Sequence, residues 1–267
     1  MFFDSHCHLT DAQFASDRAA VLERAAQAAV TRVVTICSDL ADAVAARDLA
    51  HENDGVWCTA GIHPHAAAKA DRGSLDRIRE LLEDPKVVGV GETGLDYYYD
   101  NAPRSVQRKL LEQHLQLASD HELPLIVHSR EADDDTIDML RSVEGAVRGV
   151  LHCFAGGAAL LDAGIEAGWM ISFSGLVTFK NFTGADLLRA VPSAQLLIET
   201  DSPYLAPVPH RGKRNEPSYV PQVAEAVARI RGMDAAEIGA LTSANALRFY
   251  ALMADAGQLV STTQEER

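Results

Sequence analysis

The stretch Leu125-Ile126-Val127-His128-Ser129-Arg130 joins a short run of branched apolar residues to three polar ones. Continuous hydrophobicity of this kind is typical of a strand in a parallel sheet that is covered on both faces. Seven similar apolar runs recur along the chain, at residues 2–3, 33–37, 56–60, 87–90, 149–151, 170–173 and 196–198. The sequence therefore predicts eight buried parallel strands.

Segments with helical periodicity separate these runs. They lie at about residues 15–29, 40–53, 74–84, 103–121, 131–143, 157–167, 181–190, 217–231 and 234–253. Eight alternating units favour a closed (β/α)8 barrel, an α/β fold also called a TIM barrel, over an open doubly wound sheet. One domain is expected over residues 1–260, followed by a polar tail at residues 261–267. We expect Ser74 to cap the third helix and Pro103 to lie in the first turn of the fourth.

The composition of the 267 residues, 47% hydrophobic and 23% charged, fits one large globular core. No apolar run approaches the roughly 18 residues of a membrane span, and the start lacks a signal-peptide pattern. We therefore expect a soluble, cytoplasmic protein, a monomer that does not contact membranes. A formal net charge of −14 argues against a general duplex-coating protein. The four cysteines share no CxxC spacing and are interpreted as reduced structural thiols.

Active sites of such barrels lie at the carboxyl ends of the strands, and the strong metal-ligand types of this chain follow the apolar runs. These predicted ligands are His6, His8, Glu92, His128, His152 and Asp201. Residues two apart share a face of a strand, so His6 and His8 are expected to chelate one ion. Glu92 has two oxygens and could bridge two divalent cations about 4 Å apart. The sequence therefore predicts a two-metal site.

His128 and His152 are expected to complete the second ion's ligands, and Asp201 to reach the first ion and accept a proton from a bound water. Such a site lowers the pKa of its water from about 15.7 towards roughly 7. Glu199 should point into the same interior and orient the water or tune Asp201. GxSxG, GxGxxG and P-loop patterns are absent from the expected contexts in the sequence, which leaves nucleotide-cofactor chemistry without support.

Several further residues are candidates for contacts to substrate. His63 is expected to touch a metal ligand or a substrate phosphate, although the turn around it has an equally good structural explanation. Asp96 and Tyr97 are predicted to form a pocket wall, with ordinary loop packing as the alternative. Arg130 is a candidate for a bidentate phosphate contact. The cationic residues 210–215, which include Arg214, either hold phosphates or form a solvated loop.

Taken in order, these motifs resemble the TatD family of metal-dependent deoxyribonucleases within the amidohydrolase-like barrels. The matching pieces are Asp4-Ser5-His6-Cys7-His8, Gly61-Ile62-His63-Pro64-His65, Gly91-Glu92-Thr93-Gly94-Leu95-Asp96-Tyr97, His128-Ser129-Arg130, His152-Cys153-Phe154, Glu199-Thr200-Asp201-Ser202-Pro203-Tyr204-Leu205 and Arg214-Asn215-Glu216-Pro217. The resemblance implies hydrolysis of DNA phosphodiesters, often as a 3′-to-5′ exonuclease on single strands, with Mg²⁺ or Mn²⁺ and sometimes Zn²⁺. It also implies the same six metal ligands, with Glu92 as the bridge.

DNA strand ends or oligonucleotides are therefore the expected substrate, but membership of a family does not fix the substrate. One alternative is hydrolysis of another ester or amide, such as an aminoacyl-RNA or a cyclic amide, on the same metal centre. A second alternative is a metal-binding interaction scaffold with little turnover. The complete set of ligands and a proton acceptor disfavours the scaffold.

Overall fold

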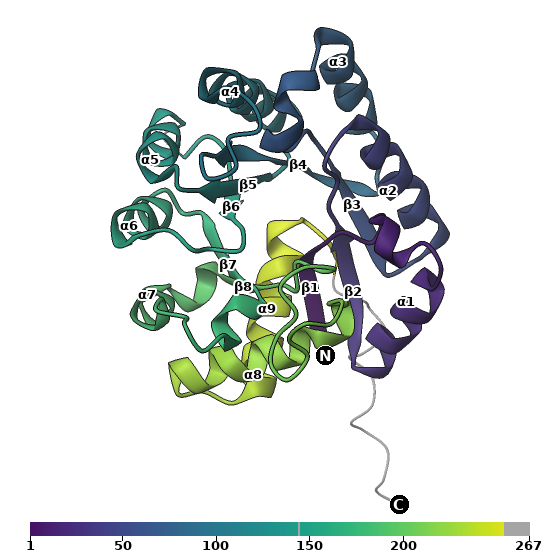
Figure 1. Cartoon of the computed structure of the whole chain (residues 1–267), viewed down its shortest axis with the longest axis vertical. Coiled ribbons are helices and arrows are strands. Elements are labelled where there is room, and N and C mark those ends of the chain that lie inside the picture. The colour runs from purple at the N-terminus through teal and green to yellow at the C-terminus, as the bar shows by residue number, and fades with distance from the viewer. Residues whose placement is uncertain (144, 254–267) are drawn as a thin grey trace, which may run out of the picture.

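Eight parallel strands follow one another in chain order around a single sheet (Figure 1), in a computed structural model that describes residues 1–143 and 145–253. The strands are β1 (Phe2–Cys7), β2 (Val30–Thr35), β3 (Val56–Ala60), β4 (Val87–Asp96), β5 (Leu125–Arg130), β6 (Gly149–Leu151), β7 (Met170–Phe173) and β8 (Leu196–Ile198). Every neighbouring pair that forms a ladder is parallel. This order confirms the predicted (β/α)8 barrel.

Helices connect the strands and surround them. They are α1 (Arg18–Gln27), α2 (Leu40–Glu52), α3 (Arg72–Leu81), α4 (Arg104–Asp120), α5 (Asp133–Ser142), α6 (Ala158–Glu166), α7 (Ala185–Ala190), α8 (Val220–Arg231) and α9 (Ala235–Phe249). Figure 1 shows α1 to α8 as an outer ring around the strands. The predicted boundary at residue 260 and the tail at residues 261–267 lie outside the described residues.

Two predictions about helix starts are wrong by a few residues. Asp71 caps α3, because its carboxylate accepts a hydrogen bond from the Ser74 N–H at 2.7 Å. Ser74 therefore lies inside the helix. Pro103 is the residue that precedes α4, and it lies just before the first turn. An acidic side chain can cap a helix as well as a serine, so spacing alone did not separate the two.

The barrel interior has its own core, distinct from the core between the sheet and the surrounding helices. Its strand residues are Phe3, Val34, Val88, Ile126, Val150, Met170 and Leu197. Phe249 at the end of α9 and the following Tyr250 join this core, and the Tyr250 hydroxyl donates to the Ser5 carbonyl oxygen at 2.9 Å. α9 therefore covers the amino-terminal end of the barrel and leaves the opposite, carboxyl-terminal rim open.

Main-chain hydrogen bonds join the segment after β8 to the end of β1. The Asp201 N–H donates to the His6 carbonyl oxygen at 2.9 Å, and the His8 N–H donates to the Ser202 carbonyl oxygen at 2.7 Å. Asp201 has a φ of 56°, a left-handed conformation that aspartate tolerates better than most residues. This seam between the first and last strands brings Asp201 beside the end of β1.

The cysteines have the predicted state, since Cys7, Cys37 and Cys58 are buried and free and Cys153 is free and half-buried. Within residues 1–143 and 145–253, every helix is too short or too polar to cross a lipid bilayer.

Candidate metal centre

Side-chain alternation along the strands continues the interior core into the site. Ile126 and Val150 belong to the core inside the barrel, and His128 and His152 follow them two residues later. Because residues two apart share a face of a strand, both imidazoles lie above the interior at the open rim. The sequence predicted them as candidate ligands because each follows an apolar run at the carboxyl end of a strand.

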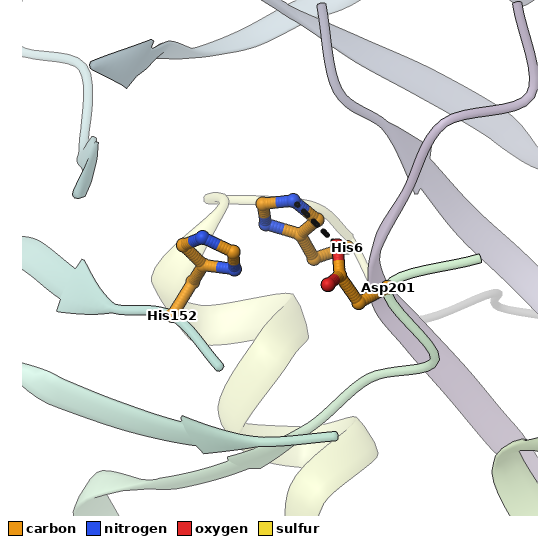
Figure 2. A group of neighbouring side chains, drawn as sticks. All are labelled: His6, His152 and Asp201. Atoms are coloured by element: carbon orange, nitrogen blue, oxygen red, sulfur yellow. Dashed lines mark ion pairs between the residues drawn. The ribbon is translucent and has the colours of Figure 1, made fainter. Parts of the chain in front are cut away.

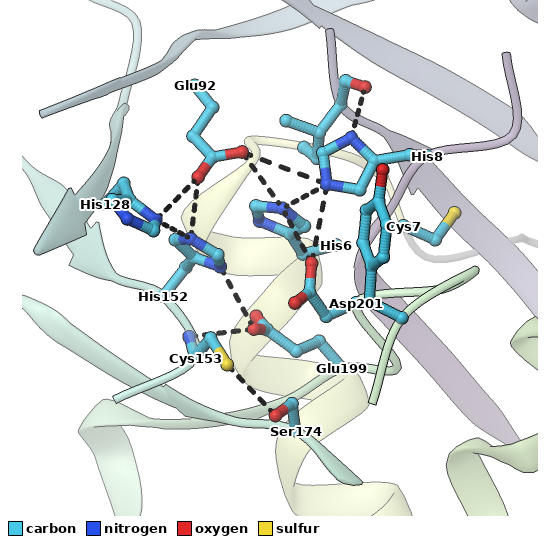
Figure 3. Close-up of polar contacts among 12 residues, drawn as sticks. His6, Cys7, His8, Glu92, His128, His152, Cys153, Ser174, Glu199 and Asp201 are labelled. Atoms are coloured by element: carbon cyan, nitrogen blue, oxygen red, sulfur yellow. Dashed lines mark hydrogen bonds and ion pairs between the residues drawn. The ribbon is translucent and has the colours of Figure 1, made fainter. Parts of the chain in front are cut away.

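Glu92 lies at the centre of the site, and its two oxygens face different histidines (Figure 3). Oε2 is 3.5 Å from His6 Nε2 and 3.9 Å from His8 Nε2. Oε1 is 2.8 Å from His152 Nε2 and 3.2 Å from His128 Nδ1. The carboxylate therefore lies between two groups of imidazoles, which is the arrangement needed to bridge two cations.

Asp201 completes the group of ligand atoms at the seam. Its Oδ1 is 3.4 Å from His8 Nε2 and 3.7 Å from His6 Nε2, and Figure 2 shows its carboxylate pointing towards His6. The two imidazole nitrogens are themselves 3.3 Å apart. His6 and His8 thus lie near both Glu92 and Asp201, the residues expected to hold the first ion.

The side chains also group in a way that the sequence did not predict. Three sets bring ligand atoms within 4.8 Å of one another, namely His6 with His8 and Glu92, His6 with His152 and Asp201, and His63 with Glu92 and His128. The His152 ring stacks on the His6 ring with centroids 3.9 Å apart, while its Nε2 is 3.3 Å from His128 Nδ1. His152 therefore lies between the two halves of the site.

Contacts behind the histidines make them suitable metal ligands. His8 Nδ1 is 3.1 Å from a main-chain carbonyl oxygen, His128 Nε2 is 3.2 Å from Asp96 Oδ2, and His152 Nδ1 is 3.2 Å from Glu199 Oε1. A ring nitrogen that donates to such an acceptor leaves the other nitrogen facing the site, where it can bind a metal ion in place of its own proton. The donor set therefore fits divalent cations, with imidazole suited to Zn²⁺ and carboxylate to Mn²⁺ or Mg²⁺.

Glu199 has a different position from the one expected. Oε1 accepts a hydrogen bond from the Cys153 N–H at 2.8 Å, and Oε2 accepts one from the Ser172 hydroxyl at 2.6 Å. Together with the contact to His152, these bonds occupy both oxygens of a fully buried side chain. Glu199 is thus directed at His152 and its surroundings, and we replace the predicted role towards Asp201 with a positioning role towards His152.

Asp4 is a buried carboxyl beneath the site that sequence reasoning left without a role. It accepts hydrogen bonds from the Thr200 N–H at 2.8 Å and from the Thr200 hydroxyl. Burial raises the pKa of Asp4 to about 8, although the bonds from Thr200 partly oppose this. Asp4 thereby ties the end of β1 to the segment that carries Asp201. Its place before Ser5-His6 in the motif was the available signal.

The carboxylates and imidazoles of the site stabilise one another's charged forms. Burial would raise the pKa of Glu92, but His152 and His63 outweigh it and hold that pKa well below its usual value. Burial likewise opposes a charge on His8, yet Asp201 and Glu92 raise the pKa of His8 to about 9. Asp201 also has a lowered pKa, because its contacts with His8 and His6 outweigh burial. Both carboxylates are therefore ionised at neutral pH, ready to bind cations.

His63 lies beside Glu92, and its hydrogen bonds leave Nε2 as a donor. Nδ1 accepts a bond from the His65 N–H at 3.1 Å, so the neutral ring carries its proton on Nε2, which is 3.5 Å from Glu92 Oε1. Burial lowers the pKa of His63 to about 4 and keeps the ring neutral. This arrangement suits donation of a hydrogen bond better than metal ligation.

Gly94 allows β4 and β5 to approach closely at the site. Its φ is +135°, and a Cβ there would lie 2.0 Å from the His128 carbonyl oxygen. Any side chain would therefore push apart the strands that carry Glu92 and His128.

Asp96 and Tyr97 do not form the predicted pocket wall. Asp96 is 1% exposed, and its Oδ2 contacts both His128 and His65 Nε2, the latter at 2.8 Å. The Tyr97 hydroxyl donates to Asp135 on α5. Asp96 therefore holds His128 from behind, and Tyr97 packs against the neighbouring helix, which was the alternative explanation.

The two predicted phosphate contacts, Arg130 and Arg214, have different environments. Arg130 is exposed, with its guanidinium 4.2 Å and 4.9 Å from the ring centroids of Tyr98 and Tyr99. Arg214 instead makes two 2.8 Å bonds to the Asp17 carboxylate and contributes to no free cationic surface. The prediction for Arg214 is therefore corrected, because its guanidinium joins the segment between β8 and α8 to Asp17, the residue before α1.

Comparison with known proteins agrees with this geometry. A family model described as TatD related DNase matches residues 3–251. The chain belongs to the TatD family. It is therefore a metal-dependent hydrolase, in agreement with the resemblance in the motifs.

Relatives match over nearly their whole length. The uncharacterized metal-dependent hydrolase YabD of Bacillus subtilis is 39% identical over 94% of this chain and 99% of its own. The 3′-5′ ssDNA/RNA exonuclease TatD of Erwinia tasmaniensis is 34% identical over 94% of this chain and 100% of its own. The crystal structure of the TatD homologue YJJV of Escherichia coli has a TM-score of 0.89 at 29% identity, covering 94% and 98% of the two chains. TatD relatives thus share the whole barrel.

Proposed function

We propose that this chain is a two-metal phosphodiesterase that removes nucleotides from single-stranded DNA ends in the 3′-to-5′ direction. The observation that carries the proposal is the central position of Glu92, whose two oxygens face separate groups of imidazoles. Two divalent cations, when bound there, would activate a water and stabilise both the attacking and the leaving oxygen of a phosphodiester. The exonuclease name of the Erwinia relative supports the substrate.

Different side chains are proposed to bind the cations and to accept the proton. His6, His8 and Asp201 would hold one cation, His128 and His152 the other, and Glu92 both. Asp201 is also the proton acceptor, since its lowered pKa keeps it ionised.

Two further groups are proposed to contact phosphates. His63 donates a hydrogen bond from Nε2 to a phosphate oxygen, because its other nitrogen is already an acceptor. Arg130 on the exposed end of β5 binds the next phosphate along the strand.

A substrate panel tests the proposal. Purified protein with chelator, Mg²⁺, Mn²⁺ or Zn²⁺ is given single-stranded DNA labelled at either end, RNA, an aminoacyl ester and an amide, alongside elemental analysis. We expect metal-dependent loss of nucleotides from the 3′ end of DNA. Glu92→Gln should abolish this activity while the fold, measured by circular dichroism, remains. Hydrolysis of the ester or amide without cleavage of any oligonucleotide would replace the proposed function by that alternative.

A further inference from the structure

A small cavity is lined by residues at the end of β7 and in the segments that follow β6 and β7. Its volume is about 250 Å³, and four phenylalanines line it, namely Phe154, Phe173, Phe179 and Phe182. Asn181 and Thr183 also line the cavity, and both are exposed. The cavity is therefore aromatic inside and polar at its mouth.

One residue that lines the cavity, Phe154, is close in sequence to the proposed metal ligand His152. Phe154 follows the ligand His152 by two residues, so their Cα atoms are at most about 7.6 Å apart. The intervening Cys153 binds Glu199 through its N–H, and its Sγ is 3.1 Å from the Ser174 hydroxyl of the loop after β7 (Figure 3). The walls of the cavity and the support of the metal ligand thus belong to one connected structure.

The positively charged side chain of Arg211 lies at the edge of the cavity, against the Phe179 ring. The guanidinium carbon of Arg211 is 3.7 Å from the centroid of the Phe179 ring, and Arg211 donates to the Ala206 carbonyl oxygen at 3.3 Å. Arg211 belongs to the cationic residues 210–215, whose Arg214 is engaged elsewhere. Arg211 therefore adds a cation–π contact to the aromatic lining.

Size and chemistry select the kind of occupant. Pockets for drug-sized ligands run from about 300 to 1,000 Å³, so a cavity of about 250 Å³ suits one flat ring system. Every nucleobase has a face that stacks on aromatic rings and edges that bond to amides and hydroxyls, and each carries a phosphate on its sugar. An aliphatic occupant would use neither the ring faces nor the polar side chains at the mouth.

We propose that the aromatic pocket binds the unstacked base of the terminal nucleotide while its phosphodiester lies at the metal centre. This inference rests on the proposed function and specifies how the site selects a strand end. A base inside the pocket leaves its stack, which is easiest for the last nucleotide of a single strand. The pocket therefore favours frayed or single-stranded ends over paired ones.

Two oligonucleotides that differ only in the terminal base test the pocket. One carries a normal terminal nucleotide and the other an abasic residue with the same phosphodiester. We expect wild-type kcat/KM to favour the base-bearing strand by roughly 5- to 150-fold, the range that corresponds to about 1–3 kcal/mol for one stacked base. Phe182→Ala should lose most of this preference by slowing cleavage of the base-bearing strand alone, whereas Phe182→Tyr should retain it.

Further variants distinguish a specific effect on the pocket from a general loss of stability. Gly184→Ala places a Cβ 2.9 Å from the Phe182 ring and should reduce the preference without removing an aromatic residue. Phe2→Ala, a half-buried phenylalanine at the far end of the barrel, is the matched control and should leave the preference unchanged. In Asp201→Asn protein, a terminal 2-aminopurine should lose fluorescence on binding, and Phe182→Ala should reverse this loss.

Failure of the pocket proposal and failure of the proposed function would give different results. Equal cleavage of both strands by the wild type, or an unchanged preference in Phe182→Ala and Gly184→Ala, would overturn the pocket and leave the proposed function standing. Cleavage of neither strand, with hydrolysis of another substrate, would overturn the proposed function itself.

Discussion

Glu92 and Glu199 are both buried glutamates at the open end of the barrel, but their oxygens have opposite surroundings. Those of Glu92 face imidazoles on both sides of the central space. Those of Glu199 are occupied by a main-chain N–H, a serine hydroxyl and the far side of His152. The facing set comprises His6, His8, Glu92, His128, His152 and Asp201, and the backing set comprises Asp4, Asp96 and Glu199.

The difference shows that residue type does not decide which set a carboxylate joins. A facing carboxylate keeps lone pairs directed at the place where cations would bind. A backing carboxylate has already used its oxygens to fix an imidazole or a strand end. Contacts of the second kind commonly tune metal affinity rather than chemistry. Substitutions in the two sets should therefore have different consequences.

The largest effect should separate Asp201 from Glu199. Asp201→Asn removes the proton acceptor, so we expect kcat/KM for the cleaved substrate to fall by roughly 10²- to 10⁴-fold even at saturating metal. Glu199→Gln should weaken metal affinity by about 10- to 100-fold and recover much of its activity when metal is added. Metal titrations of both variants, followed by steady-state kinetics, measure the contrast.

The bound metal of both variants is measured as a control. If Asp201→Asn protein bound no metal, its low activity would reflect the loss of a metal ligand and not of the proton acceptor. Equal responses of the two variants to added metal would contradict the division into two sets.

A medium effect should come from the buried Asp4. Its pKa is about 8 in the folded chain, against about 3.9 in an unfolded one. Between these values the unfolded chain loses a proton that the folded chain keeps, so stability falls as pH rises, by up to about 1.4 kcal/mol per pH unit. Asp4→Asn should lack this slope. Denaturant unfolding of metal-free protein from pH 5 to 8 measures it.

An Asn amide can still donate to the Thr200 hydroxyl, so the variant should fold at pH 5. Parallel stability curves for Asp4→Asn and wild type across this range would show that the folded carboxyl is ionised throughout.

The smallest effect should distinguish the two arginines. Arg214→Ala breaks a bidentate pair with Asp17 and should lower stability by about 1 kcal/mol, or roughly 2–4 °C in Tm, while KM for oligonucleotides changes little. Arg130→Gln should do the reverse and reduce the dependence of KM on salt by about one phosphate contact. Thermal melts and KM at several salt concentrations test both variants.

The sequence predicted the facing set because its members follow the apolar runs at the carboxyl ends of strands, and that position is visible locally. Ile126 to His128 and Val150 to His152 are steps of two residues, and the apolar member of each pair fixes the direction of the polar one. The eight strands followed from the same reasoning, since buried parallel strands have a distinctive composition.

The backing set and the arginine contacts escaped because they depend on pairing across the fold. Arg214 and Asp17 are 197 positions apart, and no periodicity connects them. In β4 the pairing with β5 shifts register between Val90 and Thr93, so alternation counted from the start of the strand does not fix the direction of Asp96. The aromatic pocket likewise combines residues of the segment after β6 with residues of β7, α7 and the segment between them.

The seam between β8 and β1 gives the metal a second consequence. His6 and Asp201 lie on either side of it, and their main chains are joined by one hydrogen bond. A cation held by both side chains would cross-link the two ends of the sheet. Chelation should then loosen the barrel at that edge, and the amides there should be the first to exchange hydrogen with solvent. Removal of the ion would therefore open the sheet locally as well as stop turnover.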